Sequence, residues 1–265
     1  LWWFFLFITI IFGNVINNIK SMEKIISYPL SILYAIVFLF WLIIFHPIQL
    51  VCYHIFGYSA HKKSVAILNF FLLRTSHILG TTYNITGREK LPINQPLVLV
   101  CNHQSMHDII PIIWFLRKVH PKFISKKELG KGIPSVSLNL RIGGSALIDR
   151  KDGKQALAEI KKVAQYINTN KYSVVIFPEG TRSKTGKPKE FATNGLKTLY
   201  KFAPDSYFVP ISINNSWKMN KFGSFPLGLG TNITLEIHEP LKVSDYSFDE
   251  IFEKTEQVIK KHIKQ

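Results

Sequence analysis

The chain has 265 residues, enough for one substantial core with an appendage but too few for several independent domains. Hydrophobic residues make up 47% of the chain and charged residues 19%, which excludes an intrinsically disordered protein. Two cysteines, Cys52 and Cys101, are too few for a disulfide framework or a multi-cysteine metal site. The formal net charge is +16, and nearly all of the excess of Lys and Arg lies after residue 60. The sequence therefore predicts a basic portion behind an apolar leader, and anionic partners for it.

The leader is apolar enough to contact lipid. Residues 25–60 contain no Asp, Glu, Lys or Arg. The most apolar piece, Leu30–His46, crosses a bilayer core of roughly 30 Å only if the helix continues through Pro47. A following segment, Val65–Leu79, has apolar residues at helical spacing and is interpreted as amphipathic. We therefore predict a membrane-attached helical segment over residues 1–80, with a single span and a re-entrant hairpin both open.

After the leader, short β-rich runs alternate with stretches of helical period. Several runs are unbroken apolar sequences, which is typical of strands buried on both faces. Between them, apolar residues recur at helical spacing over 157–167 and 251–263. The predicted strands are Thr82–Thr86, Leu97–Cys101, Lys122–Ser125, Ala146–Ile148, Ser173–Phe177, Tyr207–Ile213 and Ile233–Ile237. This alternation predicts an α/β domain over residues 81–265, with a largely parallel central sheet flanked by helices and functional residues at strand ends.

A polar cluster, residues 102–108, directly follows the second predicted strand. His103 there is suited to act as a general base, because the pKa of imidazole lies nearest neutrality. On one straight helix His103 and Asp108 would point about 140° apart, so they meet only if His103 lies in the turn before the helix. Two alternatives stay open. Ser105 and Asp108 also fit a helix capping pair, and His103 and His107 fit two metal ligands on one helix face.

A second polar cluster, residues 178–183, follows the strand that ends at Phe177. Gly180 allows the backbone to approach a ligand closely, and the planar guanidinium of Arg182 is suited to phosphate. The alternative is an ordinary turn with a solvated arginine. The basic loop over residues 184–189 either covers an anionic headgroup or is solvated surface.

Four blocks, taken together, resemble a known family. In chain order they are Asn102-His103 with Asp108, then 144–150, then 177–183, then Val209-Pro210-Ile211-Ser212. Over roughly residues 82–240 the chain resembles the glycerophospholipid acyltransferases, most closely the bacterial 1-acylglycerol-3-phosphate acyltransferases. The resemblance implies transfer of a fatty acyl group from acyl-CoA or acyl carrier protein to the sn-2 hydroxyl of 1-acylglycerol-3-phosphate, which gives phosphatidic acid. Glycerol-3-phosphate, lyso-ornithine lipid and other lysophospholipids stay open as acceptors.

The resemblance also implies roles for individual residues. His103 would deprotonate the acceptor hydroxyl, and Asp108 would orient its imidazole. The residues expected to bind substrate are Asn102, Lys126, Arg150, Glu179, Gly180, Thr181, Arg182 and Pro210. Among them, Arg182 would hold phosphate and Pro210 would belong to the acyl-donor site. Because a thioester is already activated, we expect no metal, no cofactor besides the acyl donor and no covalent nucleophile.

The expected partners are a lysophospholipid acceptor, acyl-CoA or acyl carrier protein, and membrane lipid at the cytoplasmic face of the inner or plasma membrane. Nucleic acid is not expected as a partner. The aromatic residues are concentrated in the leader, whereas nucleic-acid-binding surfaces interleave aromatic residues that stack on bases with Lys and Arg. A lipid hydrolase with a serine nucleophile is disfavoured, because no G-x-S-x-G motif occurs. A non-enzymatic basic membrane-binding protein is the alternative from another class, although it does not explain polar clusters at strand ends.

Overall fold

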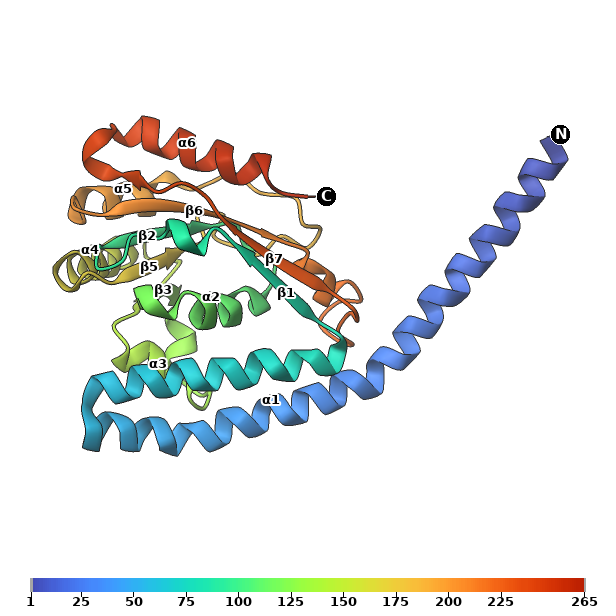
Figure 1. Ribbon diagram of the computed structural model, residues 1–265, viewed down its shortest axis with the longest axis horizontal. Helices are drawn as coiled ribbons and strands as arrows, with labels where there is room; N and C mark the ends of the chain where they lie inside the picture. The colour runs from blue at the N-terminus through green and yellow to red at the C-terminus, as the bar shows by residue number, and fades with distance from the viewer. Residues whose placement is uncertain (1, 265) are drawn as a thin grey trace.

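A computed structural model describes residues 2–264 of the chain, with side chains from residue 21 onward. It shows an eight-stranded sheet covered by helices on both faces (Figure 1). The strands are β1 Thr82–Thr86, β2 Leu97–Cys101, β3 Pro121–Lys126, β4 Ala146–Ile148, β5 Ser173–Ile176, β6 Tyr207–Asn214, β7 Asn232–Ile237 and β8 Leu241–Lys242. The α-helices are α1 Trp2–Thr75, α2 Ile109–Phe115, α3 Val136–Ile142, α4 Gly153–Asn170, α5 Thr193–Phe202 and α6 Phe248–Lys261. The predicted fold class is confirmed.

The order of the strands brings five carboxyl ends to one edge of the sheet. Along the sheet the strands follow one another as β1-β7-β6-β2-β5-β3-β4, and β8 pairs with β6. The neighbours β6, β2, β5, β3 and β4 are parallel, whereas β7 is antiparallel to β6. Each of the seven predicted strands matches an observed strand within one residue at both ends. The sequence did not predict β8, a two-residue strand with no apolar run.

The central strand β2 shows why the sheet is buried on both faces. All five of its residues are buried. Leu97 and Leu99 pack on the side of α2 and the leader, in a cluster that includes Ile112. The intervening residues Val98 and Val100 pack on the other side, in the cluster formed with α4, α5 and α6. Because successive side chains of a strand point to opposite faces, an unbroken apolar run is what a sheet between two helical layers requires.

The leader folds back on itself as a helical hairpin. Helix α1 stays helical through Pro47, but at Gly57 the backbone has φ 78° and ψ −177°. There the chain reverses, and residues 58–75 return alongside the preceding arm (Figure 1). We call residues 21–75 the leader hairpin. Its two arms pack together through Trp41 and Phe71, whose rings stack with centroids 4.1 Å apart. The leader therefore has the shape of a helical hairpin, and its placement relative to a membrane stays a prediction.

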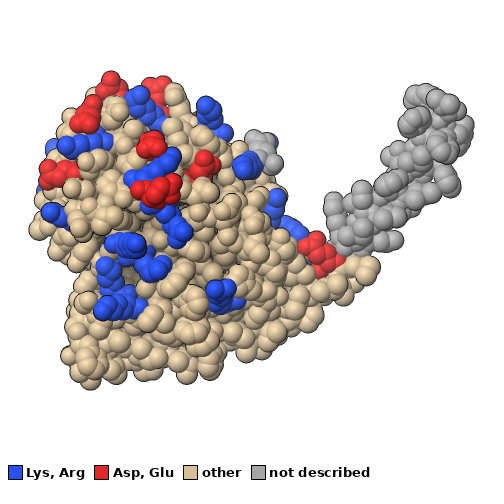
Figure 2. Space-filling view, in the orientation of Figure 1, with Lys and Arg blue, Asp and Glu red and all other residues tan. Residues whose placement is uncertain are grey.

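The leader hairpin has one face on the α/β domain and one face turned outward. Toward the domain, Leu42, Phe45 and Leu68 share a buried cluster with Ile110 of α2. On the outer face large apolar side chains are exposed, and they are Ile25, Ile26, Ile32, Leu33, Ile36, Leu39, Phe40, Ile43, Ile44, Ile48, Val51, Ile55, Phe56 and Ile67. By length and composition the stretch Ser21–Leu79 is apolar enough to cross a membrane. Figure 2 shows this outer face as a broad surface with few charged residues below the charged domain.

Replacement of Gly57 by alanine is expected to lower the free energy of unfolding by about 1–3 kcal/mol, because its backbone conformation is essentially restricted to glycine. A Cβ at Gly57 would meet nothing within 4 Å, so the loss comes from backbone strain alone. The matched control is Gly153→Ala, where a Cβ also has open space but φ is not positive. Denaturant unfolding of both variants in detergent micelles makes the comparison. Equal stability of Gly57→Ala and the wild type would contradict the hairpin turn.

Candidate active site

The predicted site residues lie at the carboxyl ends of four adjacent parallel strands. His103 follows β2, Arg182 follows β5, Lys126 ends β3 and Arg150 follows β4. These strands lie next to one another in the order β2-β5-β3-β4. Segments up to 79 residues apart in the sequence therefore meet at one edge, where ligands bind in open parallel sheets.

His103 and Asp108 form the pair that the spacing predicted. Asp108 Oδ2 lies 2.8 Å from His103 Nδ1, and the short helix that carries Asp108 begins only at Met106. His103 thus lies in the turn before that helix, as the angular argument required. The Asp108 side chain is fully buried and that of His103 is 15% exposed. Within the described residues Nε2 of His103 makes no hydrogen bond, so it is free to meet a substrate.

The Asp108 carboxylate is fixed by four donors. Oδ2 accepts the backbone N–H groups of Gln104, at 2.8 Å, and Ser105, at 3.0 Å, in addition to the bond to His103. Oδ1 accepts the hydroxyl of Ser216, which follows β6. Such bonds hold the carboxylate in one orientation. Asp108 therefore keeps a proton on His103 Nδ1 and leaves Nε2 as the basic nitrogen.

The capping interpretation and the catalytic interpretation of this cluster turn out to be compatible. Ser105 and Asp108 form a capping box at the start of the short helix Met106–Asp108. The oxygen of Asp108 that caps the helix is the same one that holds His103. Helix formation at this point thus places the carboxylate that orients the imidazole.

His107 occupies a different environment from His103. It is buried, and its Nδ1 lies 3.3 Å from the hydroxyl of Tyr34 in the leader hairpin. Burial, together with the positive charge of Arg182, lowers the pKa of His107 to about 4, so the ring is neutral at pH 7. His107 therefore links the leader hairpin to the turn that carries His103.

The loop after β5 is tied to the turn that carries His103. The backbone N–H of His103 donates to Glu179 Oε1 at 2.8 Å, and the backbone N–H of Ser183 donates to the His103 carbonyl at 2.7 Å. The other oxygen of Glu179 accepts the N–H of Lys189 at 3.1 Å. Burial raises the pKa of Glu179, while these N–H groups stabilise its charge. The carboxylate of Glu179 thus holds two loops together.

Gly180 and Thr181 shape the tip of the same loop. Gly180 has φ 68°, a left-handed conformation that glycine adopts without strain, and a Cβ there would meet nothing within 4 Å. The Thr181 hydroxyl accepts a hydrogen bond of 2.7 Å from Lys189 Nζ. Both residues are exposed, so the loop presents open backbone next to Arg182.

Three cations at the edge lack an acidic partner. Arg182, Arg150 and Lys126 are exposed, and none of them forms an ion pair within the described part of the chain. Burial lowers the pKa of Arg150, the charge of Glu128 opposes this, and the charge of Arg182 adds a smaller lowering effect. The same charge acts on His107, so Arg182 lies within electrostatic reach of the catalytic turn. An unpaired cluster of this kind suits a phosphorylated ligand.

Two residues expected to bind substrate are instead buried in the sheet. Asn102 is 1% exposed, and its amide exchanges hydrogen bonds of 2.8 and 2.7 Å with the backbone of Ile213. Pro210 is buried within β6 opposite Val100. Asn102 thus joins the ends of β2 and β6, and Pro210 lies in the sheet below the site. Neither side chain faces the open edge, and a part of either residue in substrate binding stays a prediction.

The comparison with protein families agrees with this geometry. A family model described as Acyltransferase matches residues 82–214, about half of the chain. The chain belongs to the Acyltransferase family. The matched residues begin at β1 and end at β6, so they contain the His103–Asp108 pair and the loop of Arg182.

Individual relatives place the chain more closely within the Acyltransferase family. It is 32% identical over 178 residues to a 1-acyl-sn-glycerol-3-phosphate acyltransferase of Cocos nucifera, covering 66% of this chain and 54% of that protein. It is 34% identical over 173 residues to a protein of the same name from Helicobacter pylori, covering 62% and 69%. The chain spans about half the length of most curated relatives that it matches.

A solved structure shares the fold. The crystal structure of the 1-acyl-sn-glycerophosphate (LPA) acyltransferase PlsC from Thermotoga maritima superimposes with a TM-score of 0.73 at 23% identity. The match covers 92% of this chain and 96% of that one, so it includes much of the leader as well as the Acyltransferase domain.

Sequence reasoning did not predict three contacts of the site. Ser216 binds Asp108 across 108 residues, and Tyr34 reaches His107 from the leader hairpin. The ring of Phe177 stacks on His103 with centroids 4.1 Å apart. Phe177 belongs to the block 177–183 that the sequence analysis identified, but only the fold shows that its ring packs against the imidazole of His103. No local pattern marks the other two contacts.

Proposed function

We propose that this Acyltransferase family member transfers a fatty acyl group from an acyl thioester to the sn-2 hydroxyl of 1-acylglycerol-3-phosphate, giving phosphatidic acid. The observation that supports it is the free Nε2 of His103, held by Asp108, at the same sheet edge as the unpaired cations Arg182, Arg150 and Lys126. The names of the relatives point to the same acceptor.

His103 acts as the general base in this reaction. Its Nε2 takes the proton of the acceptor hydroxyl while that oxygen attacks the thioester carbonyl. The C–O bond forms, the C–S bond breaks, and the departing thiolate receives the proton from His103. Asp108 stabilises the imidazolium that exists in between. Phe177 keeps the ring in its plane by stacking against one face.

No side chain of the protein acts as a covalent nucleophile in this proposal. Cys101, the nearest thiol, is fully buried, and burial raises the pKa of that thiol well above its usual range. Ser105 uses its hydroxyl in the capping box and in a bond of 2.9 Å to Asn220. We infer that the acyl group passes directly from donor to acceptor, because a thioester is already activated and needs no covalent nucleophile, metal or further cofactor.

Arg182 recognises the acceptor phosphate. A guanidinium makes two parallel hydrogen bonds to a phosphomonoester, and the open backbone at Gly180 allows the phosphate to approach. Arg150 and Lys126 add positive charge on the neighbouring strand ends, for the acceptor or for the phosphates of the donor.

A panel of acceptors tests the proposed function. Purified protein is incubated with labelled acyl-CoA or acyl carrier protein and with 1-acylglycerol-3-phosphate, glycerol-3-phosphate, lyso-ornithine lipid or lysophosphatidylcholine, and products are separated by lipid chromatography. We expect phosphatidic acid to be the main product. Preference for another acceptor would place the chain elsewhere in the family, and no transfer to any acceptor would favour a non-enzymatic membrane protein.

The exposed face of the leader hairpin attaches the enzyme to the membrane, and we place it at the cytoplasmic side, where acyl thioesters are available.

Ile36 and Ile43 are 61% and 53% exposed on this face. The double variant Ile36→Lys/Ile43→Lys is expected to release much of the protein from neutral liposomes in a flotation assay, since burying two ammonium groups in lipid costs several kcal/mol. The control Leu157→Lys, at a site 38% exposed on α4, should stay bound. Undiminished flotation of the double variant would contradict membrane contact by this face.

A further inference from the structure

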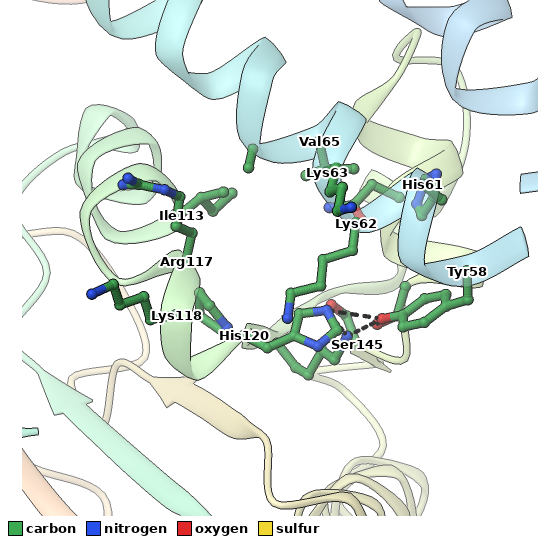
Figure 3. A pocket seen from close by; sticks show the side chains of 15 residues that line it. Tyr58, His61, Lys62, Lys63, Val65, Ile113, Arg117, Lys118, His120 and Ser145 are labelled. Atoms are coloured by element: carbon green, nitrogen blue, oxygen red, sulfur yellow. Dashed lines mark hydrogen bonds between the residues drawn. The ribbon is translucent and has the colours of Figure 1, made fainter. Parts of the chain in front are cut away.

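A cavity lies near the amino end of β3, at the edge of the sheet opposite the candidate active site. It has a volume of 230 Å³ and is lined by the start of β3, by the end of α3 and by the return arm of the leader hairpin (Figure 3). Pro121, at the amino end of β3, lines this cavity, whereas Lys126 ends the same strand at the catalytic edge. At about 3.3 Å per residue, roughly 16 Å of strand separates the two places. The cavity is therefore not part of the active site.

The lining of this cavity carries only positive charge. Lys62, Lys63, Arg117, Lys118 and Lys122 belong to it, and no Asp or Glu does. None of these five side chains forms an ion pair with a described residue. Two come from the leader hairpin and three from the segment before and within β3, so the fold brings the charges together. Lys62 acts electrostatically on Lys122, whereas the guanidinium of Arg117 lies at the rim over the ring of Trp114. An anion between Lys62 and Lys122 would relieve the repulsion between these two groups.

Lys122 is the most unusual member of the set, because its ammonium group is buried without a carboxylate. The side chain is 2% exposed. Its Nζ lies between the rings of Tyr58, Tyr166 and Tyr172, at 4.9, 5.9 and 5.1 Å from their centroids. Burial and the charge of Lys62 lower the pKa of Lys122 to about 7. An anion in the cavity would supply the missing counter-charge.

His120 provides a second, independent sign of a ligand. It is 8% exposed, and its Nε2 lies 2.8 Å from Lys122 Nζ and 3.1 Å from the Tyr58 hydroxyl. Its Nδ1 is buried, and among the described side chains and backbone it has no hydrogen-bond partner. Figure 3 shows the Lys62 side chain reaching from the hairpin toward this ring. A buried polar atom without a partner is rare in folded proteins and marks a place where a further group belongs.

The surroundings of the cavity indicate where the anion comes from. The hairpin turn at Gly57 adjoins it, since Tyr58, the next residue, lines the cavity. Just before the turn, Ile55 and Phe56 are 70% and 69% exposed and belong to the apolar outer face. Figure 2 shows Lys and Arg side chains gathered directly above that uncharged surface. A bilayer presents the same order, with phosphates above acyl chains.

We propose that this cavity binds the phosphate group of an anionic membrane phospholipid, with Lys62 and Arg117 contacting it from the rim and Lys122 and His120 from the floor. The proposal rests on membrane contact by the leader hairpin, and it is independent of which acceptor the active site takes. The bound headgroup fixes the turn end of the hairpin to the lipid surface, while Tyr34 near the other end holds the catalytic turn.

The test measures binding of a soluble short-chain lipid to the full chain in non-ionic detergent. All proteins carry Arg182→Gln, so that the phosphate site proposed at the catalytic edge does not contribute. The pocket variant is Lys62→Gln/Arg117→Gln, which leaves buried Lys122 in place and is expected to fold. The matched control, Lys197→Gln/Lys254→Gln, removes the same charge from α5 and α6 on the other face of the sheet. Isothermal titration and the shift in Tm report binding.

We expect dihexanoylphosphatidylglycerol to raise Tm of the parent and the control, and the pocket variant to bind it at least about tenfold more weakly, because charge-assisted hydrogen bonds are lost. Inorganic phosphate and dihexanoylphosphatidylcholine should give much smaller shifts. Undiminished binding by the pocket variant would overturn the site. Equal binding of inorganic phosphate would overturn the lipid as ligand, and equal binding of the zwitterionic lipid would overturn recognition by charge. None of these binding experiments measures acyl transfer, so their outcomes are separate from those of the acceptor panel.

Discussion

His103→Ala is expected to lower kcat for acyl transfer by about 10²- to 10⁴-fold, the usual contribution of a general base. Nε2 of His103 is free, and the other histidine of the turn, His107, is buried and bound to Tyr34, so it cannot take over. The rate is measured with purified protein, labelled acyl thioester and 1-acylglycerol-3-phosphate in mixed micelles.

The control for this prediction is His54→Ala, which removes an exposed histidine of the leader hairpin. It should leave turnover close to that of the wild type. Circular dichroism and Tm establish that both variants are folded, since the backbone bonds of His103 to Glu179 and Ser183 do not depend on its side chain. Turnover of His103→Ala within a few-fold of the wild type would show that the base has been misassigned.

Arg182→Lys is expected to lower kcat/KM for 1-acylglycerol-3-phosphate by about ten- to a hundredfold, mainly through KM. The charge is retained, but the pair of parallel hydrogen bonds to the phosphomonoester is lost, and a charge-assisted hydrogen bond contributes about 1.5–3 kcal/mol. Turnover of lysophosphatidylcholine, a zwitterionic acceptor with a phosphodiester, should change little.

Kinetics on the two acceptors, wild type beside variant, decide between phosphate recognition and a general disturbance of the loop. Arg88→Lys serves as the matched control, because Arg88 is exposed and lies over the ring of Phe115, away from the catalytic edge. An equal loss on both acceptors, or a comparable loss in Arg88→Lys, would refute the role assigned to Arg182.

The local patterns of the sequence were sufficient to predict most of the sheet and the contact between His103 and Asp108. Unbroken apolar runs such as that of β2 locate buried strands, and the five-residue spacing of His103 and Asp108 limits how they can meet. Both signals are short-range, because they depend on the period of one strand or one turn. The structure agrees with them closely.

The leader shows where such patterns stop being informative. Pro47 is the obvious helix breaker in the sequence, yet the helix continues through it and reverses at Gly57. Proline removes one backbone hydrogen bond, whereas the reversal at Gly57 is stabilised by contacts such as Trp41 with Phe71, which only the folded hairpin provides. Local residue preferences cannot reveal a turn that depends on packing between two arms.

The same reasoning explains which features of the site the sequence did not reveal. Asn102 belongs to the motif that contains His103, so adjacency suggested a shared ligand, but successive residues at a strand end point in different directions. Ser216 and the basic cavity around Lys122 combine segments from distant parts of the chain. These residues come together only when the strands have taken their order in the sheet, so no spacing in the sequence predicts the contacts.

The two-sided attachment of the His103 backbone limits how the enzyme can be re-engineered. The backbone N–H of His103 donates to the Glu179 carboxylate, and the His103 carbonyl accepts from the backbone N–H of Ser183. Glu179 and Ser183 both belong to the loop that carries Arg182. Grafting that loop from a relative with another acceptor would therefore move the base together with the headgroup contacts. Under the proposed mechanism, acceptor preference and turnover rate depend on the same pair of connected segments, so a library that varies the loop needs to vary the turn over residues 102–108 at the same time.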